Sequence, residues 1–327
     1  MSFEQRINAA WYGKPGGLLL LLPLTFVFRF IAALRRRVIS PQPCGAPLIV
    51  VGNISVGGSG KTPAVLALAE YCRDRGYRVG IVSRGYGGKA PYYPYLLDSS
   101  AEPNIAGDEP CLIARRSGLP VAVAPDRLAA AKLLVDQKGC NLIISDDGLQ
   151  HYRMARDIEV LLLDGQRGFG NGYCLPVGPL REPISRAKQV DITIINGGSN
   201  SFSGHTMLLR GDTAIELGSG ERRSLQEWPE AERRVHAVAG IGNPQRFFDA
   251  LRERGFDVVE HPFADHHAFI AKDLNFADAC PIIMTEKDAV KCAGFHLQNS
   301  WMLPVDAALD ARFFAQFSGL LERLPAP

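Results

Sequence analysis

The sequence predicts an α/β protein with a mostly parallel sheet covered by helices on both faces, a second and smaller α/β domain, and an N-terminal membrane-associated helix. The sheet is predicted because short apolar strands alternate with helical segments through residues 41–200. An apolar run before the first strand predicts the membrane-associated helix, and a renewed alternation predicts the second domain. We therefore expect a helix at 1–40, a first domain at 41–200, a linker at 201–232 and a second domain at 233–327.

The composition is that of an ordinary globular chain. Its 327 residues, 46% of them hydrophobic and 21% charged, are enough for two packed domains. The formal net charge of +2 is too small for wholesale nucleic-acid binding, so no nucleic-acid partner is expected. The seven cysteines are scattered without a C-x-x-C pair, which is typical of reduced thiols in the cytosol and of neither a disulfide framework nor a zinc site.

The apolar run extends from Pro15 to Leu34 and is closed by Arg35–Arg37. A spanning helix needs about 20 apolar residues, and this run reaches that length only if Pro23 and Arg29 are tolerated. We favour a helix that lies in the membrane interface with its arginines on anionic head groups; a true span and a buried core helix are the alternatives. A cleavable signal peptide is disfavoured because no small-residue cleavage site follows. In both membrane interpretations the next domain faces the cytoplasm.

A glycine-rich loop follows the first predicted strand, Leu48–Gly52, and precedes the helix-like Ala64–Tyr71. This is the strand–loop–helix layout of a P-loop NTPase, in which glycines let backbone N–H groups surround a polyphosphate. Lys61 would add a positive charge for the outer phosphates, and Thr62 a hydroxyl ligand for Mg²⁺. Ser55 replaces the first glycine of the general pattern, so the loop is a variant; a structural turn is the alternative. The predicted nucleotide-binding residues are Ser55, Val56, Gly57, Gly58, Ser59, Gly60, Lys61 and Thr62.

Two other predicted strands end in residues suited to ligand binding. The strand that begins at Asn141 is followed by Asp146 and Asp147, which is the Walker B arrangement for holding Mg²⁺ or its water shell; an N-cap role is the alternative. The strand Tyr77–Ser83 is followed by the glycine-rich loop Arg84–Gly88. We predict that this loop faces substrate or phosphate, with a flexible connector as the alternative.

The later part of the chain repeats the α/β pattern less regularly. We expect Asp191–Gly198 to be the last strand of the first sheet, and the segment up to Trp228 to have only weak strand character. The second unit is expected to contain strands at 235–239, 257–260, 281–284 and 301–305 and a helix at 245–254. Its loop Asp265–His267 holds adjacent histidines that point apart. This loop is therefore predicted to supply a catalytic or substrate-binding histidine and not a zinc site.

Taken together, these motifs resemble those of the tetraacyldisaccharide 4'-kinase family, the lipid A 4'-kinases of Gram-negative envelopes. The resemblance covers most of the chain, including the apolar N-terminal segment, and Ser55 at the first P-loop position is typical of the family. Besides the P-loop, the matching motifs are Arg84–Gly87, Gly107–Pro110, Asp146–His151, Gly178–Pro183, Asp265–His267 and Thr285–Asp288.

The resemblance implies ATP- and Mg²⁺-dependent phosphorylation of the 4'-hydroxyl of a tetraacylated glucosamine disaccharide 1-phosphate. It also implies a monotopic or peripheral enzyme on the cytoplasmic face of the inner membrane, with that surface and the lipid substrate as partners and no obligate protein partner evident. Two other classes stay open from the residues alone. A membrane-recruited partition-type ATPase switch is disfavoured because Val56 replaces its first lysine, and a soluble small-metabolite kinase would not need the apolar run.

The resemblance also assigns roles to residues. Asp108 resembles the family's catalytic aspartate and is expected to accept the hydroxyl proton, an N-cap being the alternative. Either His266 or His267 is expected to orient it, and Lys61 completes the catalytic set. The metal is expected on Thr62, Asp146, Asp147 and Glu182. The acceptor is expected on Arg84, Tyr86, Asn53, Gln150, His151 and Arg181.

Overall fold

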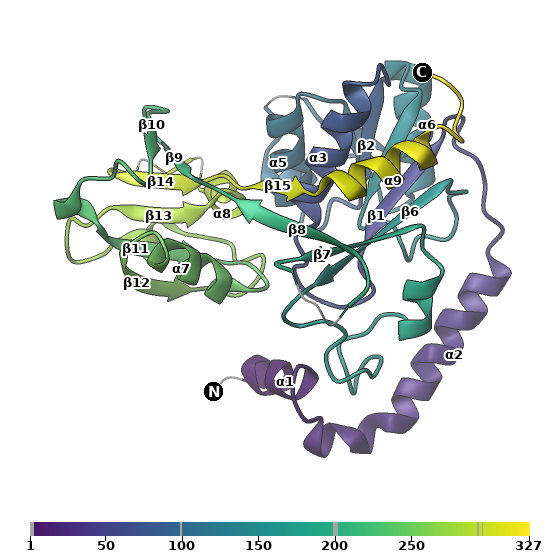
Figure 1. Ribbon diagram of the computed structural model, residues 1–327, viewed down its shortest axis with the longest axis horizontal. Helices are drawn as coiled ribbons and strands as arrows, with labels where there is room; N and C mark the ends of the chain where they lie inside the picture. Colours follow the sequence, from purple (N-terminus) through teal and green to yellow (C-terminus); the bar gives the residue numbers. More distant parts are fainter. Residues whose placement is uncertain (1–2, 99, 199–201, 293, 296) are drawn as a thin grey trace.

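A nine-stranded sheet forms the centre of the larger lobe (Figure 1). The computed structural model describes residues 3–98, 100–198, 202–292, 294–295 and 297–327. The strand order is β15-β8-β7-β6-β1-β5-β2-β4-β3, and all neighbours are parallel except β15 with β8 and β3 with β4. The strands are β1 (Leu48–Gly52), β2 (Val79–Ser83), β3 (Tyr95–Leu96), β4 (Val121–Val123), β5 (Leu142–Asp146), β6 (Ile158–Asp164), β7 (Ile192–Asn196), β8 (His205–Arg210) and β15 (Asp306–Leu309). This arrangement confirms the predicted mostly parallel sheet.

Helices cover both faces of the sheet, as predicted. Successive side chains of a strand point to opposite faces, so Ile49 and Val51 of β1 pack with one set of helices and Leu48 and Val50 with another. The first set contains α3 (Lys61–Arg73), α5 (Asp108–Ser117) and α9 (Ala311–Leu321), and the second contains α6 (Arg127–Lys138). The short helix α4 (Pro103–Ala106) precedes α5.

The smaller lobe is built on a six-stranded sheet in the order β10-β9-β14-β13-β11-β12. Its strands are β9 (Thr213–Glu216), β10 (Arg222–Ser224), β11 (Arg234–Ala239), β12 (Asp257–Pro262), β13 (Ile282–Thr285) and β14 (Ser300–Leu303). The helices α7 (Pro244–Arg252) and α8 (Glu286–Lys291) belong to this lobe, which lies beside the larger one in Figure 1. The four predicted strands of the second unit are therefore present.

The chain passes between the lobes more often than predicted. The expectation that the strand at 191–198 ends the first sheet is wrong, because β8 and β15 also belong to that sheet. The expected linker at 201–232 contributes β8 to the first sheet and β9 and β10 to the second. The expected second domain at 233–327 ends in β15 and α9, which belong to the larger lobe. Pairing with two neighbours stabilises β8 although only Met207 of its side chains is buried, so its sequence lacks the apolar–polar alternation that predicts a strand.

The N-terminal segment forms two helices, α1 (Phe3–Trp11) and α2 (Leu22–Val38), joined by a 3₁₀ helix η1 (Gly16–Leu21). The stretch from Gly16 to Val38 is long and apolar enough to cross a membrane. Its side chains are largely exposed, with Leu20 86% and Phe30 69% accessible, so the alternative of a buried core helix is wrong. Figure 1 shows α2 as an arm along the outside of the larger lobe.

The return of α9 to the larger lobe generates a stability prediction. Phe317 is fully buried against Phe313 and Tyr71, so Phe317→Ala should lower the free energy of unfolding by about 3–5 kcal/mol through lost burial and a cavity. Urea denaturation measures this change. Arg312→Ala, at an exposed position of the same helix, should change the stability by less than about 0.5 kcal/mol. An equally small effect of Phe317→Ala would contradict the packing of α9.

Candidate functional site

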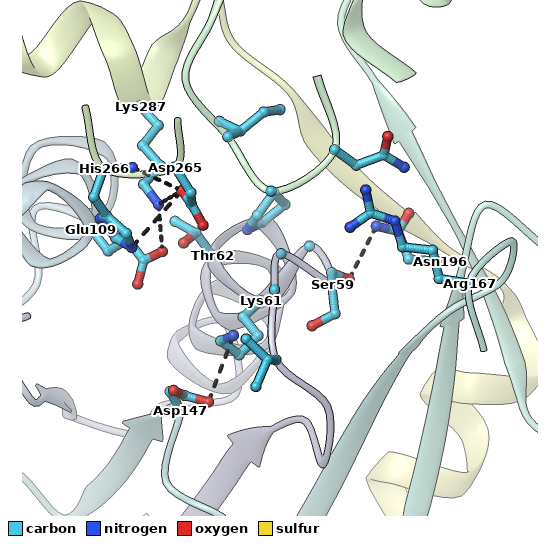
Figure 2. A pocket seen from close by; sticks show the side chains of 18 of the residues that line it. Ser59, Lys61, Thr62, Glu109, Asp147, Arg167, Asn196, Asp265, His266 and Lys287 are labelled. Atoms are coloured by element: carbon cyan, nitrogen blue, oxygen red, sulfur yellow. Dashed lines mark hydrogen bonds and ion pairs between the residues drawn. The ribbon is translucent and has the colours of Figure 1, made fainter. Parts of the chain in front are cut away.

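The P-loop joins β1 to α3 and is held in shape by neighbouring segments. Inside the loop, Asn53 Nδ2 donates to Gly57 O at 3.1 Å and to Ser59 Oγ at 3.2 Å. Asn196 Nδ2, at the end of β7, donates to Ser59 O at 3.1 Å (Figure 2). Gly60 has φ +83° and a Cβ there would collide with Asn196 Nδ2, so only glycine fits. The loop therefore keeps an open turn at the N-terminus of α3, where backbone donors and the helix dipole favour phosphate.

The loop at 178–183 supports the P-loop from outside. Val56 N donates to Pro179 O at 2.8 Å, and Arg181 N donates to Ile54 O at 2.7 Å. A backbone bridge also joins Ser55 to Leu180. The many prolines and glycines of this segment thus serve a fixed loop.

The smaller lobe reaches the P-loop through the turn that precedes α7. A Cβ on Gly242 would lie 2.5 Å from Gly58 N, so the two glycine backbones are in close approach. This close approach explains why residue 242 is a glycine. Nearby, Arg246 Nη2 of α7 lies 3.4 Å from Asp164 Oδ2 at the end of β6. The two lobes therefore meet at the rim of the P-loop.

Asp147 brings a negative charge to the P-loop lysine. Lys61 Nζ lies 3.6 Å from Asp147 Oδ1 (Figure 2). Arg181 Nη1 lies 3.0 Å from Asp147 Oδ2. Burial alone would raise the pKa of Asp147, but the charges of Lys61, Arg181 and Arg127 outweigh it and lower the pKa to about 2. Asp147 has φ +49°, a left-handed conformation that aspartate tolerates better than most residues. Its carboxylate is ionised at neutral pH and holds Lys61 at the loop.

Asp146 has the environment expected of a metal-binding carboxylate. It pairs with Val51 in the parallel ladder, which places it beside the start of the P-loop. Its Oδ2 accepts from Ser83 Oγ at 3.2 Å, whereas its buried Oδ1 has no donor in the described part of the chain. Burial and the charge of Glu109 raise the pKa of Asp146 to about 7. Such an orphaned oxygen fits Mg²⁺, and Asp146 and the Thr62 hydroxyl would hold the ion, which neutralises charge on the phosphates when it is bound.

Glu182 does not have such an environment. One of its oxygens accepts from Tyr152 OH and the other from Gln150 Nε2 at 2.8 Å, and Arg186 Nε lies 3.7 Å away. Gln150 Nε2 also donates to Asn53 O at 3.1 Å. The structure therefore gives no support to the expected metal role of Glu182. Its carboxylate orients Gln150 beneath the P-loop, and the sequence could not show that both oxygens are already occupied.

A charged cluster joins the lobes across the cleft from the P-loop. Asp108, at the first position of α5, accepts from His266 Nδ1, with 3.1 Å between Nδ1 and Oδ2. Lys287 Nζ of α8 lies 3.0 Å from Glu109 Oε1 and 3.2 Å from Asp265 Oδ1 (Figure 2). It also lies 3.8 Å from Asp108 Oδ2. Three acids thus surround one lysine and one histidine. Each charge has an opposite partner, which offsets the cost of partial burial.

The pKa values in this cluster follow from these contacts. Burial alone would raise the pKa of Asp108, but the hydrogen bond from His266 and the charge of Lys287 lower it. The same hydrogen bond raises the pKa of His266. The pKa of Lys287 is also raised, because Glu109, Asp108 and Asp265 outweigh its burial. The contact is therefore strongest at pH values above the lowered pKa of Asp108 and below the raised pKa of His266, where both groups are charged. It weakens when the pH falls below or rises above this window.

The structure separates the two histidines that spacing left equivalent. His266 has φ +59° and turns toward Asp108, and its ring lies 4.9 Å from the ring of Tyr86. His267 Nε2 instead lies 2.9 Å from Asp273 Oδ2, and its ring packs between Phe263 and Phe269. His266 is therefore the histidine in position to orient Asp108, and the predicted role of His267 has no geometric support.

The remaining predicted substrate residues lie around one cavity of about 2100 Å³. Arg84 and Tyr86 are exposed at its wall, in the loop after β2. Burial and the charge of Arg127 lower the pKa of His151 to about 4, so its ring is neutral at physiological pH. The cavity is also lined by the P-loop, by His266 and Lys287 of the smaller lobe, and by residues of α1 and α2.

Several residues of the cavity were not predicted. Glu109 and Lys287 lie inside the motifs Gly107–Pro110 and Thr285–Asp288. Their charge and their position in these motifs could have indicated that they belong to the site. Tyr12, Arg167 and Asn196 lie far from any motif, and only the fold brings them to the P-loop.

Comparison with known proteins decides the family. A family model described as tetraacyldisaccharide-1-P 4'-kinase (LpxK) matches residues 18–322. The chain belongs to this family. Relatives named tetraacyldisaccharide 4'-kinase from Pseudomonas putida (strain GB-1) and Pseudomonas aeruginosa (strain LESB58) are each 46% identical to it, over 99% and 100% of both chains respectively. LpxK from Aquifex aeolicus, solved in complex with ATP, is 27% identical with a TM-score of 0.76 and covers 94% of this chain and 98% of its own.

These findings confirm the predicted family, fold class and enzyme class. The protein is an ATP-dependent kinase of lipid A biosynthesis, as membership of the tetraacyldisaccharide 4'-kinase family indicates. The P-loop geometry described above agrees with ATP as the phosphate donor.

The contact between Asp108 and His266 generates a pH prediction. In Asp108→Asn the anionic acceptor is lost, whereas burial and the charge of Lys287 remain and both lower the pKa of His266. The pKa of His266 should therefore fall from its raised value toward the ordinary 6.5, with the charge of Asp265 still raising it. NMR titration of ¹³C-labelled histidine rings measures this shift. The matched change Asp273→Asn, beside His267, should leave the His266 titration unmoved; equal shifts in both variants would refute the pairing.

Proposed function

We propose that this kinase transfers the γ-phosphate of ATP to the 4'-hydroxyl of a tetraacylated glucosamine disaccharide 1-phosphate. The observation that supports this acceptor is one continuous cavity of about 2100 Å³, which extends from Lys61 in the P-loop to Phe28 and Ile31 on α2. A sugar hydroxyl at the polar end and acyl chains at the apolar end match such a lining. A lipid A precursor has both parts in one molecule.

Phosphoryl transfer requires positioning, neutralisation of charge and a group that takes the hydroxyl proton. Backbone N–H groups of the P-loop and Lys61 bind the triphosphate in this proposal. Asp108 accepts the proton in this proposal, because its lowered pKa keeps it ionised at neutral pH and it is hydrogen-bonded to His266, which lines the cavity. His266 orients Asp108, and Lys287 holds the loop that carries His266.

The enzyme acts as a monotopic protein on the cytoplasmic face of the inner membrane in this proposal. Contacts along α2 support an interfacial helix over a span: Thr25 Oγ1 donates to Cys174 O at 3.3 Å, Phe28 packs on the core that includes α6, and Arg36 Nη2 donates to Gln189 Oε1 at 2.8 Å. A helix that crossed the bilayer would carry these polar contacts into hydrocarbon. An enzyme anchored beside a lipid acceptor also meets it at a raised effective concentration.

Phosphate transfer from radiolabelled ATP to purified tetraacyl disaccharide 1-phosphate in detergent micelles tests the proposed reaction. The unmodified protein should form a labelled product, and Lys61→Ala should lower kcat by at least about 10²-fold because a charge on the phosphates is lost. Asp108→Asn should lower kcat by about 10²–10⁴-fold with little change in ATP affinity. Asp273→Asn makes the same chemical change beside His267 and should keep kcat within about twofold. Absence of product with the unmodified protein would refute the acceptor, and unchanged turnover of Asp108→Asn would remove the base.

Co-sedimentation with vesicles of anionic phospholipid tests the membrane assignment. Leu20→Glu together with Phe30→Glu places two charges on exposed apolar positions of η1 and α2 and should reduce vesicle binding at least about tenfold. Tyr92→Glu, which alters an exposed aromatic residue of the larger lobe, should leave binding unchanged. Equal loss in both proteins, or no loss in either, would contradict an anchor built from α2.

A further inference from the structure

The turn after α1 lies directly against the P-loop. Tyr12 OH donates to the carbonyl oxygen of Val56 at 3.0 Å, while Val56 N donates to Pro179 O at 2.8 Å. Val56 is therefore tied on both sides, once by the loop at 178–183 and once by the N-terminal segment.

The hydrogen bond from Tyr12 also orients the next N–H group. Val56 C=O and Gly57 N–H belong to one planar trans peptide unit, so they point in opposite directions. Holding the oxygen toward Tyr12 turns Gly57 N–H to the other side, and this N–H has no acceptor within the described part of the chain. Gly57 has φ +104° and no Cβ, so sterics alone restrain the Val56–Gly57 peptide only weakly if the oxygen is released. The direction of Gly57 N–H, a backbone donor of the P-loop, therefore depends on Tyr12, a residue outside the loop.

Tyr12 is itself held in place. The guanidinium of Arg167 lies 4.9 Å from the centre of the Tyr12 ring, and its Nη1 lies 3.7 Å from the position that a Cβ on Gly57 would take. Burial raises the pKa of Tyr12, so its phenol keeps the proton that it donates. One cation therefore packs against both the tyrosine and the loop that the tyrosine supports.

The chain next to Tyr12 is anchored in the larger lobe. Asn171 N donates to Trp11 O at 2.7 Å, and Asn171 Nδ2 donates to Ala10 O at 3.1 Å. Trp11 Nε1 donates to Pro176 O at 3.1 Å. A Cβ on Gly170 would lie 2.6 Å from Trp11 O, so a glycine is needed for this approach. These bonds fix the backbone next to Tyr12 to the larger lobe, at the point where the N-terminal segment passes the P-loop.

We propose that Tyr12 is a positioning residue for the nucleotide: its hydroxyl fixes the Val56–Gly57 peptide so that Gly57 N–H faces the phosphates of ATP. The N-terminal segment then has a second task besides membrane association, since it completes the wall of the P-loop. This inference rests on the proposed use of ATP at the P-loop, but not on the identity of the acceptor.

Tyr12→Phe in the full-length protein tests the proposal, because it removes the hydroxyl and keeps the ring on Arg167. Titration calorimetry with a non-hydrolysable ATP analogue and Mg²⁺ in detergent micelles should show binding weakened about fivefold to tenfold, the effect of one hydrogen bond. In the transfer assay KM for ATP should rise by the same factor, whereas kcat at saturating ATP should stay within about twofold.

Tyr71→Phe is the matched control. It removes a hydrogen bond of the same kind, from Tyr71 OH to Phe314 O at 3.2 Å, on the side of α3 that faces α9. ATP affinity should be unchanged in this variant. Unaltered affinity in Tyr12→Phe, or equal weakening in both variants, would overturn the proposal. Failure of the unmodified protein to phosphorylate the disaccharide would refute the proposed acceptor alone and would leave the binding comparison valid.

Discussion

The shape of the P-loop is the constraint on which the rest of the site depends. A loop that binds phosphate with its own N–H groups cannot spend them on a sheet or a helix, so it needs support from elsewhere. Here that support comes from Asn53 within the loop, Asn196 on a neighbouring strand, the loop at 178–183 and Tyr12 of the N-terminal segment. Segments distant in sequence are thus required to hold one turn of backbone.

Ion pairs impose the second constraint, the relative placement of the lobes. Asp108 and Glu109 belong to the larger lobe, and His266 and Lys287 to the smaller one. Partly buried charges are costly when they lack a partner, so the arrangement that pairs all of them is favoured over one in which the lobes separate. The chain reinforces it by crossing between the lobes repeatedly, through β8 and β15. The cavity that the P-loop lines is thereby also lined by Glu109, His266 and Lys287 of this cluster.

Much of the site was predictable because its chemistry demands particular residue types. Lys61, Thr62 and Asp146 follow from the phosphate and metal they would bind, and parallel strands bring their carboxyl ends to one edge of the sheet. The expected metal role of Glu182 has no support in the structure, and its partners Tyr152, Gln150 and Arg186 are visible only in the folded chain. Likewise, the choice of His266 over His267 follows from backbone conformation, since His266 has a left-handed φ and turns toward Asp108.

The sequence by itself determined the α/β class, the P-loop, the family and the exposed apolar arm, because each depends on local residue types in a short stretch. Only the tertiary structure decided that β8, β15 and α9 complete the larger lobe and that Tyr12 lies on the P-loop. Edge strands and supporting side chains are specified by pairing with distant partners. The apolar face of α9, with Phe313, Phe317 and Leu320, is periodic but does not say which sheet it covers. The residues of the motifs can therefore be predicted from the sequence, whereas the contacts that hold them in place arise from long-range packing.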